Sequence, residues 1–378
     1  MSSLLLTHAR VVSPDLDLEE GCILIRNGRI VAVSTAADFE ADEVVDLSGR
    51  MVMPGFFDIH CHGADGHDVC DNTTESIRHI ARRKLQEGVT TWLPTTLTQP
   101  REALEEIAAH CDEYRRNPGF CRAPGLHVEG PFINPKNAGA QNPQYVRPPD
   151  LEELQRIHEI CPTLVLSLAP ELPGADELMR RACELGITCS AAHTSATAGQ
   201  IRDAQHAGLR HLTHFCNAMT PLHHREIGVV GAGLMDDGLM LEIICDGIHL
   251  CPDMLRLLFR LVPIDRLMLI TDSMAASWID KGEVMLGGLE VLVENGRAVL
   301  KDGGALAGST LRFNEGIRMV VESTGMPLDQ IVKATSWNQA RSLGLAGFGK
   351  IEAGFHADLA ILNPDFSVYK TVVGGEFR

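Results

Sequence analysis

Short apolar runs alternate with amphipathic segments through the middle of the chain. Eight apolar runs are candidate strands: Met51–His62, Val89–Pro94, Gly125–Glu129, Leu164–Leu168, Ile187–His193, His211–His214, Leu239–Asp246 and Leu267–Asp272. Segments with the helical period separate most of them, for example SIRHIARRKLQEG, REALEEIAAHCDEYRR and DELMRRACELG. A repeat of about 30 residues is typical of a strand followed by a helix. The pattern therefore predicts an α/β protein built as a (β/α)8 TIM-type barrel.

The two ends of the chain lack the helical period. Residues 1–50 hold apolar runs joined by turns, including the hairpin signal Asn27-Gly28, and residues 346–378 hold HADLAILN and VYKTVVGGEF. We expect these ends to form a small β-sandwich domain together, with residues 51–345 as the catalytic barrel. Residues 283–300 interrupt the repeat and predict an inserted β-hairpin around Asn295-Gly296.

Charge and cysteine usage narrow the classes of partner. A formal net charge of −17 argues against a nucleic-acid or anionic-membrane partner. The 11 cysteines are scattered without a CxxC pair, which favours reduced thiols over a disulfide framework. The opening residues MSSLLLTHARVV do not resemble a signal peptide, and no apolar run is long enough to span a membrane. We therefore expect a cytoplasmic protein.

The segment FFDIHCHG ends the first candidate strand with two histidines. Residues two apart in a strand point to the same face, so His60 and His62 are expected to project side by side. Such a pair is a typical part of a divalent metal site. By itself an HxH pair is equally compatible with two structural histidines, so the other strand ends decide between these interpretations.

Four more polar residues stand at predicted strand ends: Glu129, His193, His214 and Asp272. Because the carboxyl ends of barrel strands meet on one face, these side chains are expected to converge with His60 and His62. Imidazole and carboxylate ligands favour Zn²⁺, with Fe²⁺, Mn²⁺ or Co²⁺ as alternatives. Cys61 should point away from this group, and His127 is expected to be a packed histidine rather than a ligand.

Longer motifs carry a family resemblance over nearly the whole chain. In order they are PGFFDIHCHG, GLHVEGPF, LAPE, AAHTSAT, THFCNAM, DGIH, TDSM, LAGSTL and HADLAILNP. They resemble the amidohydrolase superfamily and, within it, the N-acetylglucosamine-6-phosphate deacetylase family. The resemblance implies metal-dependent hydrolysis of the N-acetyl amide of N-acetyl-D-glucosamine 6-phosphate, in amino-sugar catabolism. The galactosamine epimer, or another amide handled by an amidohydrolase, remains an alternative substrate.

The resemblance also assigns roles at the expected metal site. It implies that Glu129, His193 and His214 hold the principal metal, and that His60 and His62 can hold a second one with Glu129 bridging. One or two metals per subunit are therefore expected. The resemblance further implies that Asp272 is the general base and then the general acid; a plain metal ligand or a helix cap is the alternative.

Substrate recognition is expected from loops. By resemblance, Arg225 and His249 bind the 6-phosphate with help from the backbone at Asn217 and Ala218. The arginine is expected to reach in from a neighbouring subunit, which predicts a homodimer. Gln141 stands where many family members carry a histidine near the substrate carbonyl. It can donate a hydrogen bond there but cannot carry a positive charge.

Overall fold

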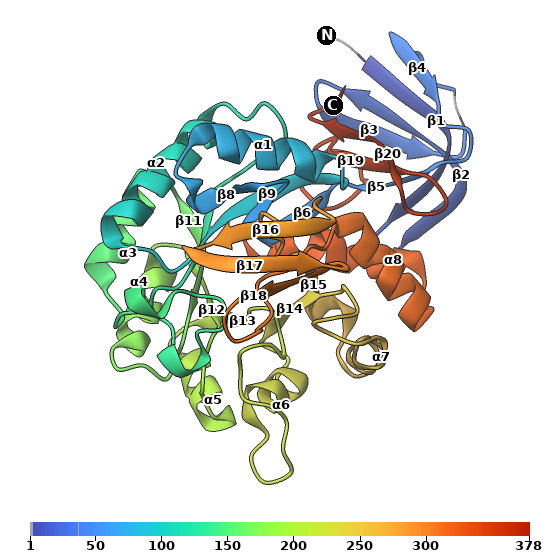
Figure 1. Ribbon diagram of the computed structural model, residues 1–378. Coiled ribbons are helices and arrows are strands. Elements are labelled where there is room, and N and C mark those ends of the chain that lie inside the picture. Colours follow the sequence, from blue (N-terminus) through green and yellow to red (C-terminus); the bar gives the residue numbers. More distant parts are fainter. Residues whose placement is uncertain (1–2, 37) are drawn as a thin grey trace.

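Eight parallel strands form the centre of the computed structural model, which describes residues 3–36 and 38–378 (Figure 1). Hydrogen bonds join them in the order β6 (Phe56–Cys61), β9 (Val89–Thr96), β10 (Leu126–Glu129), β11 (Thr163–Leu168), β12 (Thr188–Ala191), β13 (Leu209–Leu212), β14 (Met240–Ile244) and β15 (Leu267–Ile270). The first and last strands meet where the Asp272 amide donates to the His60 carbonyl at 2.9 Å. The predicted TIM-type barrel is thereby confirmed.

Helices follow the strands and cover the outside of the barrel. They are α1 (Thr74–Leu85), α2 (Arg101–Arg116), α3 (Leu151–Ile160), α4 (Ala175–Glu184), α5 (Ala198–His206), α6 (Gly228–Met235), α7 (Pro252–Leu261), α8 (Phe313–Thr324), α9 (Leu328–Ile331) and α10 (Trp337–Ser342). In α1 the Thr73 side chain caps the first turn, and Ile77 and Ile80 are buried on the face toward the strands. Spacings of three and four residues thus produce the apolar stripe that packs α1 onto the barrel.

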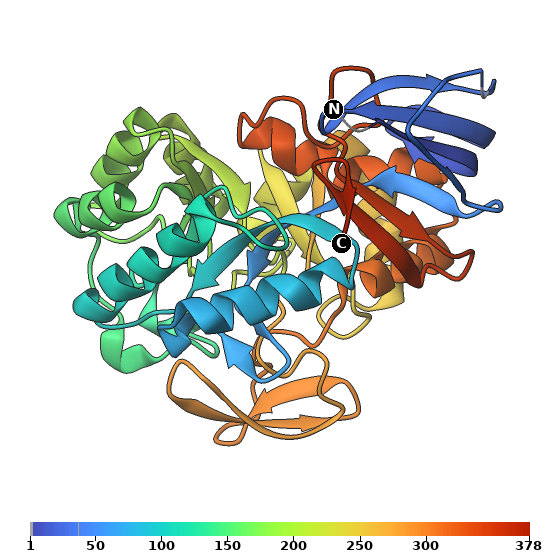
Figure 2. The same ribbon diagram turned by 90° about the horizontal axis from the view of Figure 1, so that it is seen from above.

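Both ends of the chain contribute strands to a second sheet, seen beside the barrel in dark blue and red (Figure 2). Its order is β21 (Glu376–Phe377), β20 (Val368–Val373), β19 (Leu359–Leu362), β5 (Met51–Pro54), β1 (Ser3–Ser13), β2 (Leu16–Arg26) and β3 (Arg29–Ser34), with β4 (Glu43–Asp46) paired to β1. Asn27 and Gly28 both have positive φ angles, 52° and 71°, as a tight two-residue hairpin requires. An additional sheet from both chain ends was predicted and is confirmed.

The predicted strand Met51–His62 is wrong as one element. It is divided at Gly55 into β5, which pairs with β1 and β19, and β6, which pairs with β9. A Cβ atom on Gly55 would lie 2.1 Å from the Thr90 hydroxyl, so only glycine allows the two sheets to approach here. The change of sheet thus falls beyond the boundary expected at residue 50. The division into two domains stays a prediction.

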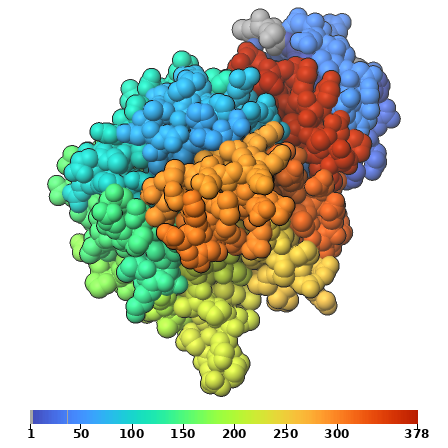
Figure 3. Space-filling view, in the orientation of Figure 1, coloured from blue at the N-terminus to red at the C-terminus, as the bar shows by residue number. Residues whose placement is uncertain are grey.

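The insertion has three strands where a two-stranded hairpin was expected. These are β16 (Lys281–Leu286), β17 (Leu289–Glu294) and β18 (Arg297–Leu300), antiparallel and joined in that order. Positive φ angles at Asn295 and Gly296 form the turn that the sequence indicated. In the space-filling view the insertion lies across the face of the barrel (Figure 3). A further short pair, β7 (Gly63–Ala64) and β8 (His67–Asp68), follows β6.

Within residues 3–36 and 38–378, no helix is both long and apolar enough to cross a bilayer.

Candidate active site

A pocket of about 380 Å³ opens at the carboxyl ends of the barrel strands. Most of the residues predicted to act in the site line it: His62, Glu129, Gln141, His193, His214, Asn217, Ala218, His249 and Asp272. Leu286 of β16 closes one side, so the insertion contributes to the wall. The pocket therefore brings together residues that are up to 210 positions apart in the chain (His62 to Asp272: 272 − 62 = 210).

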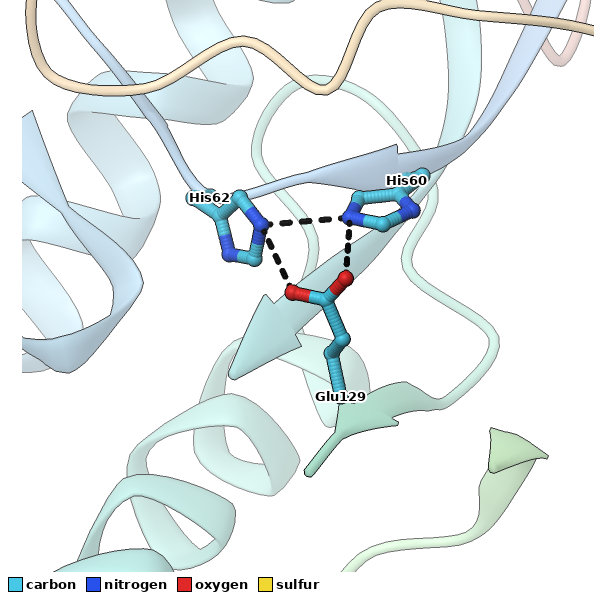
Figure 4. A group of neighbouring side chains, drawn as sticks. All are labelled: His60, His62 and Glu129. Carbon is cyan, nitrogen blue, oxygen red and sulfur yellow. Dashed lines mark hydrogen bonds and ion pairs between the residues drawn. The ribbon is translucent and has the colours of Figure 1, made fainter. Parts of the chain in front are cut away.

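His60 and His62 project side by side from the end of β6 toward the carboxylate of Glu129 on β10 (Figure 4). Their Nε2 atoms are 3.1 Å apart. His60 Nε2 lies 3.6 Å from Glu129 Oε1, and His62 Nε2 lies 3.3 Å from Glu129 Oε2. All three side chains are buried. The parity of strand β6 thus places both imidazoles on the inner face of the barrel.

His193 and His214 approach the same carboxylate from the other side. Their Nε2 atoms are 3.2 Å apart and lie 3.4 and 3.2 Å from Glu129 Oε1. Glu129 is therefore shared by two groups of three residues, one with His60 and His62 and the other with His193 and His214. In each group the histidine nitrogens and the carboxylate oxygen lie close enough to one another to hold an ion. This is the arrangement that a carboxylate bridging two cations requires.

The distances between these atoms match the coordination shell of a divalent metal. Ligands about 2.0–2.1 Å from a tetrahedral zinc ion lie about 3.3 Å from one another. Glu129 Oε1 is also buried and has no hydrogen-bond partner among the described residues. A buried carboxylate oxygen is costly unless it is paired. The residues present therefore fit one or two divalent cations.

Hydrogen bonds from Nδ1, the ring nitrogen that points away from the site, fix the orientation of two of the imidazoles. His193 Nδ1 donates to the carbonyl of Asn137 at 2.8 Å, and His62 Nδ1 donates to the carbonyl of Thr95 at 3.1 Å. Because the proton is on Nδ1, Nε2 keeps its lone pair directed into the site. These backbone acceptors come from loop and strand residues that no sequence motif indicated.

Electrostatics in the cluster favour bound positive charge. Burial alone would raise the pKa of Glu129, but the surrounding histidines hold it well below its ordinary value. Burial likewise would raise the pKa of Asp272, but His60 and His62 lower it. Conversely, burial would lower the pKa of His62, but hydrogen bonds with the two carboxylates raise it to about 9. The two buried anions thus favour positive charge at the imidazole Nε2 atoms, which either a proton or a metal ion would provide.

Three of the predicted strand-end residues lie two positions beyond their strands, and His62 lies one position beyond β6, which corrects the predicted strand bounds. Strand β12 ends at Ala191, β13 at Leu212 and β15 at Ile270. His193, His214 and Asp272 follow with positive φ angles of 45°, 35° and 50°. Such left-handed backbone is uncommon for residues other than glycine and concentrates at active sites. Here the turn directs each side chain across the barrel mouth.

Asp272 lies close to the first histidine pair. Its Oδ1 atom is 3.3 Å from His62 Nε2 and 3.5 Å from His60 Nε2. The backbone of this segment is held by Asp58, whose carboxylate accepts from the amide and hydroxyl of Thr271 at 3.1 and 2.5 Å. Asp58 belongs to the strand segment FFDIHCHG, but its role was not foreseen.

The inner wall behind the cluster holds residues that were not predicted as part of the site. Glu242 and His211 are fully buried and lie 3.0 Å apart. Burial would raise the pKa of Glu242, but its contacts with His211 and His60 lower it to about 2. The sequence did carry a signal for a buried functional carboxylate here, because Glu242 is the one charged residue in the apolar strand β14.

His127 is the packed residue that the sequence predicted. Its Nδ1 donates to the carbonyl of Ile59 at 2.8 Å, and its Nε2 pairs with the Ser167 hydroxyl at 2.7 Å. Burial lowers the pKa of His127 to about 3, so the ring is neutral. With both nitrogens engaged, this histidine is unsuited to hold a metal.

His249 and Asn217 reach the pocket from the loops after β14 and β13. His249 Nδ1 is 2.7 Å from Asp246 Oδ2. Burial would lower the pKa of His249, but this contact raises it above its ordinary value, which favours the cation. Asn217 Nδ2 donates to the carbonyl of His214 at 3.1 Å. His249 therefore suits this side of the pocket to an anionic group, whereas the side-chain amide of Asn217 is engaged with the carbonyls of His214 and Phe215.

Arg225 is not brought to the pocket of its own chain. It is exposed in the loop between β13 and α6, where Nη1 is 2.8 Å from His224 Nε2. That yellow-green segment projects from the body of the molecule (Figure 3). Its position is compatible with the expected reach into a neighbouring subunit, which stays a prediction.

Comparison with known proteins agrees with this architecture. The model of the amidohydrolase family matches residues 51–378. The chain belongs to the amidohydrolase family. Members of this family are metal-dependent, in agreement with the two clusters around Glu129. The family prediction made from the sequence motifs is confirmed.

Related proteins cover almost the entire chain. N-acetylglucosamine-6-phosphate deacetylase of Bacillus subtilis (strain 168) is 36% identical over 99% of this chain and 96% of its own. N-acetylgalactosamine-6-phosphate deacetylase of Escherichia coli O157:H7 is 34% identical over 97% of each. A mutant N-acetyl-D-glucosamine-6-phosphate deacetylase of Mycobacterium smegmatis, solved in complex with N-acetyl-D-glucosamine-6-phosphate, is 31% identical with a TM-score of 0.93, covering 100% of this chain and 99% of that one.

Proposed function

We propose that this amidohydrolase removes the acetyl group from N-acetyl-D-glucosamine 6-phosphate, releasing D-glucosamine 6-phosphate and acetate. The observation that carries the proposal is the buried Glu129 carboxylate between two histidine pairs, with Asp272 beside one of them. Relatives of full length that bear this activity in their names support the choice of substrate. The reaction is hydrolysis of a linear amide.

Two groups of residues would hold the metal. Glu129, His193 and His214 form the principal site, and His60 and His62 share Glu129 in a second one. Zn²⁺ suits these ligands best, with Fe²⁺, Mn²⁺ and Co²⁺ as alternatives. A divalent cation here supplies Lewis acidity, which polarises the amide carbonyl and lowers the pKa of water.

Asp272 is proposed to carry the proton. Its carboxylate takes a proton from the water molecule that attacks the acetyl carbon and passes that proton to the nitrogen of the departing sugar amine. The carbon–nitrogen bond breaks as the carbon–oxygen bond is retained in acetate. The low pKa of Asp272 supports this role, because the group must be ionised before the water attacks.

The 6-phosphate is proposed to bind at the side of the pocket formed by His249 and the backbone of Asn217 and Ala218. A histidine whose pKa is raised offers a charged donor to phosphate oxygens. Gln141 faces the same pocket, and the second Nε2 proton, beyond the one that bonds to Glu129, is the candidate donor toward the acetyl carbonyl. Together these groups orient the sugar with its amide toward Glu129 and Asp272.

A homodimer would complete the site with Arg225. The loop that carries this arginine projects from the molecule, and its neighbour Leu222 is 56% exposed. Met235 at the end of α6 is 76% exposed. Exposed apolar side chains beside a projecting cation suit contact with a second copy of the chain, whose pocket the guanidinium would then reach.

The galactosamine epimer is the second candidate substrate. The name of the Escherichia coli relative supports N-acetyl-D-galactosamine 6-phosphate in this place.

The cysteines suit a reducing compartment such as the cytoplasm. All 11 are free thiols in the described residues.

Acetate release from four sugars tests the proposal. The panel consists of the N-acetylated glucosamine and galactosamine, each with and without the 6-phosphate, assayed with protein loaded with Zn²⁺. We expect the highest kcat/KM for N-acetyl-D-glucosamine 6-phosphate. A higher value for the galactosamine phosphate would transfer the function to the epimer, and no acetate from any of the four would exclude the proposal.

A further inference from the structure

Glu242 lies directly behind His60 in the interior of the barrel. One of its oxygens, Oε1, is 3.0 Å from His211 Nδ1. The other, Oε2, faces His60 Nδ1 at 3.8 Å. Among the described residues neither Glu242 Oε2 nor His60 Nδ1 has a hydrogen-bond partner, although both side chains are fully buried. Two buried polar atoms of opposite character thus face each other without a bond to any third group.

The separation excludes a bridging water molecule. A water that bonds to two atoms at normal distances and angles holds them about 4.5 Å apart. At 3.8 Å the two atoms can instead close to a direct hydrogen bond with a small rotation of either side chain. Leaving both unpaired would be costly in an interior of low dielectric constant.

A separate metal site at this place is excluded by His127. Ligand atoms of His60, His127 and Glu242 lie near enough to one another to hold an ion. However, both nitrogens of His127 already bond to the Ile59 carbonyl and the Ser167 hydroxyl. The remaining two residues, Glu242 and His60, have the geometry of a carboxylate that accepts a hydrogen bond from a metal-ligating histidine.

We propose that Glu242 is a positioning residue that accepts a hydrogen bond from His60 Nδ1 and directs His60 Nε2 toward the second metal site. This inference rests on the metal site proposed above. His62 and His193 donate from Nδ1 to backbone carbonyls, whereas the Nδ1 atom of His60 faces the carboxylate of Glu242. A carboxylate acceptor fixes the tautomer and increases the basicity of the imidazole more than a carbonyl does.

Zinc binding by two Glu242 variants tests the inference. Glu242→Leu removes the acceptor, and Glu242→Gln keeps its shape without the charge. Zinc dissociation constants and stoichiometry are measured by chelator competition and elemental analysis on reconstituted protein. We expect zinc to bind about 10- to 100-fold more weakly at the His60–His62 site in the leucine variant and less so in the glutamine variant. The site formed by His193 and His214 should keep its affinity.

Ser190→Ala is the matched control. The Ser190 hydroxyl bonds to Thr213 at 2.5 Å in the same buried interior without touching a proposed ligand. Its removal should leave zinc affinity within a factor of two of wild type. An equal loss in this control, or wild-type affinity in both Glu242 variants, would overturn the inference. If the leucine variant does not fold, as judged by circular dichroism, the glutamine variant decides. Wild-type protein that binds no zinc would instead refute the metal site itself.

Discussion

Gln141 Nε2 donates a hydrogen bond to Glu129 Oε2 at 2.5 Å. The amide oxygen of Gln141 accepts from the Thr98 backbone N–H at 2.7 Å. Only an oxygen can accept from that N–H, so the orientation of the amide is determined by its surroundings. Gln141 therefore ties the carboxylate shared by the two metal groups to the loop after β9. This contact was not foreseen when Gln141 was interpreted as a substrate-binding residue.

Replacing Gln141 by leucine should lower kcat/KM for the phosphorylated amino sugar by about 10- to 100-fold. A hydrogen bond to a charged group contributes about 1.5–3 kcal/mol, and here it orients the carboxylate common to both groups. Steady-state kinetics with Zn²⁺ in excess measure the effect. Asn142→Leu, one residue along the same loop, is the control and should change kcat/KM less than threefold. A leucine variant as active as wild type would show that this contact does not support catalysis.

The two histidine pairs should differ in their effect on activity. His193→Ala or His214→Ala removes a ligand of the principal site, so we expect loss of more than 99% of the activity and loss of metal by elemental analysis. His60→Ala or His62→Ala should be milder if the second ion is optional. A chelator should inactivate the wild type, and added Zn²⁺ should restore it. Active protein free of metal would contradict the proposed mechanism.

Asp272→Asn should preserve folding and substrate binding while lowering kcat by about 10²- to 10⁴-fold. General acid–base catalysis by a positioned group contributes about this much to a rate. Rapid-quench measurement of acetate release and calorimetric binding of N-acetyl-D-glucosamine 6-phosphate separate turnover from affinity. A variant that retains more than a tenth of the wild-type kcat would exclude Asp272 as the proton carrier.

Arg225→Ala should raise KM for the 6-phosphate by about 10- to 100-fold and leave the unphosphorylated sugar almost unaffected. Its fork of donors would contribute about 1.5–3 kcal/mol to a bound phosphate. Arg180→Ala, an exposed arginine on α4, is the control for loss of one positive charge. Sedimentation of the wild type tests the dimer that would supply Arg225. The same KM change for both sugars would argue against phosphate recognition by this residue.

Lys84→Met should destabilise the protein by about 3–5 kcal/mol. Lys84 Nζ is fully buried and pairs with Asp58 at 2.9 Å and with Glu87 at 2.5 Å, so its loss leaves two buried carboxylates uncompensated. Urea unfolding of the two proteins measures the difference. Lys301→Met removes an exposed pairing with Glu283 at 3.3 Å and should change stability by less than about 1 kcal/mol. Similar values for both variants would show that burial does not govern the effect.

Local patterns in the sequence determined the repeating elements and the chemical character of the site. The spacing of apolar residues predicted helix α2 over REALEEIAAHCDEYRR, where the structure has Arg101–Arg116. The parity of FFDIHCHG likewise predicted that His60 and His62 share a face. Such features depend on neighbours within a few positions, because backbone period and side-chain direction are local properties.

Contacts across the barrel were decided only by the tertiary structure. Gly55 divides one apolar run between two sheets because Thr90 leaves no room for a side chain. His193 and Asp272 turn into the mouth through left-handed backbone that no local pattern indicated. Glu242 faces His60, 182 positions away (242 − 60 = 182), only because the barrel closes. The sequence alone determines the residue types and their period. Which buried charges meet depends on the packing of strands that are distant in the sequence.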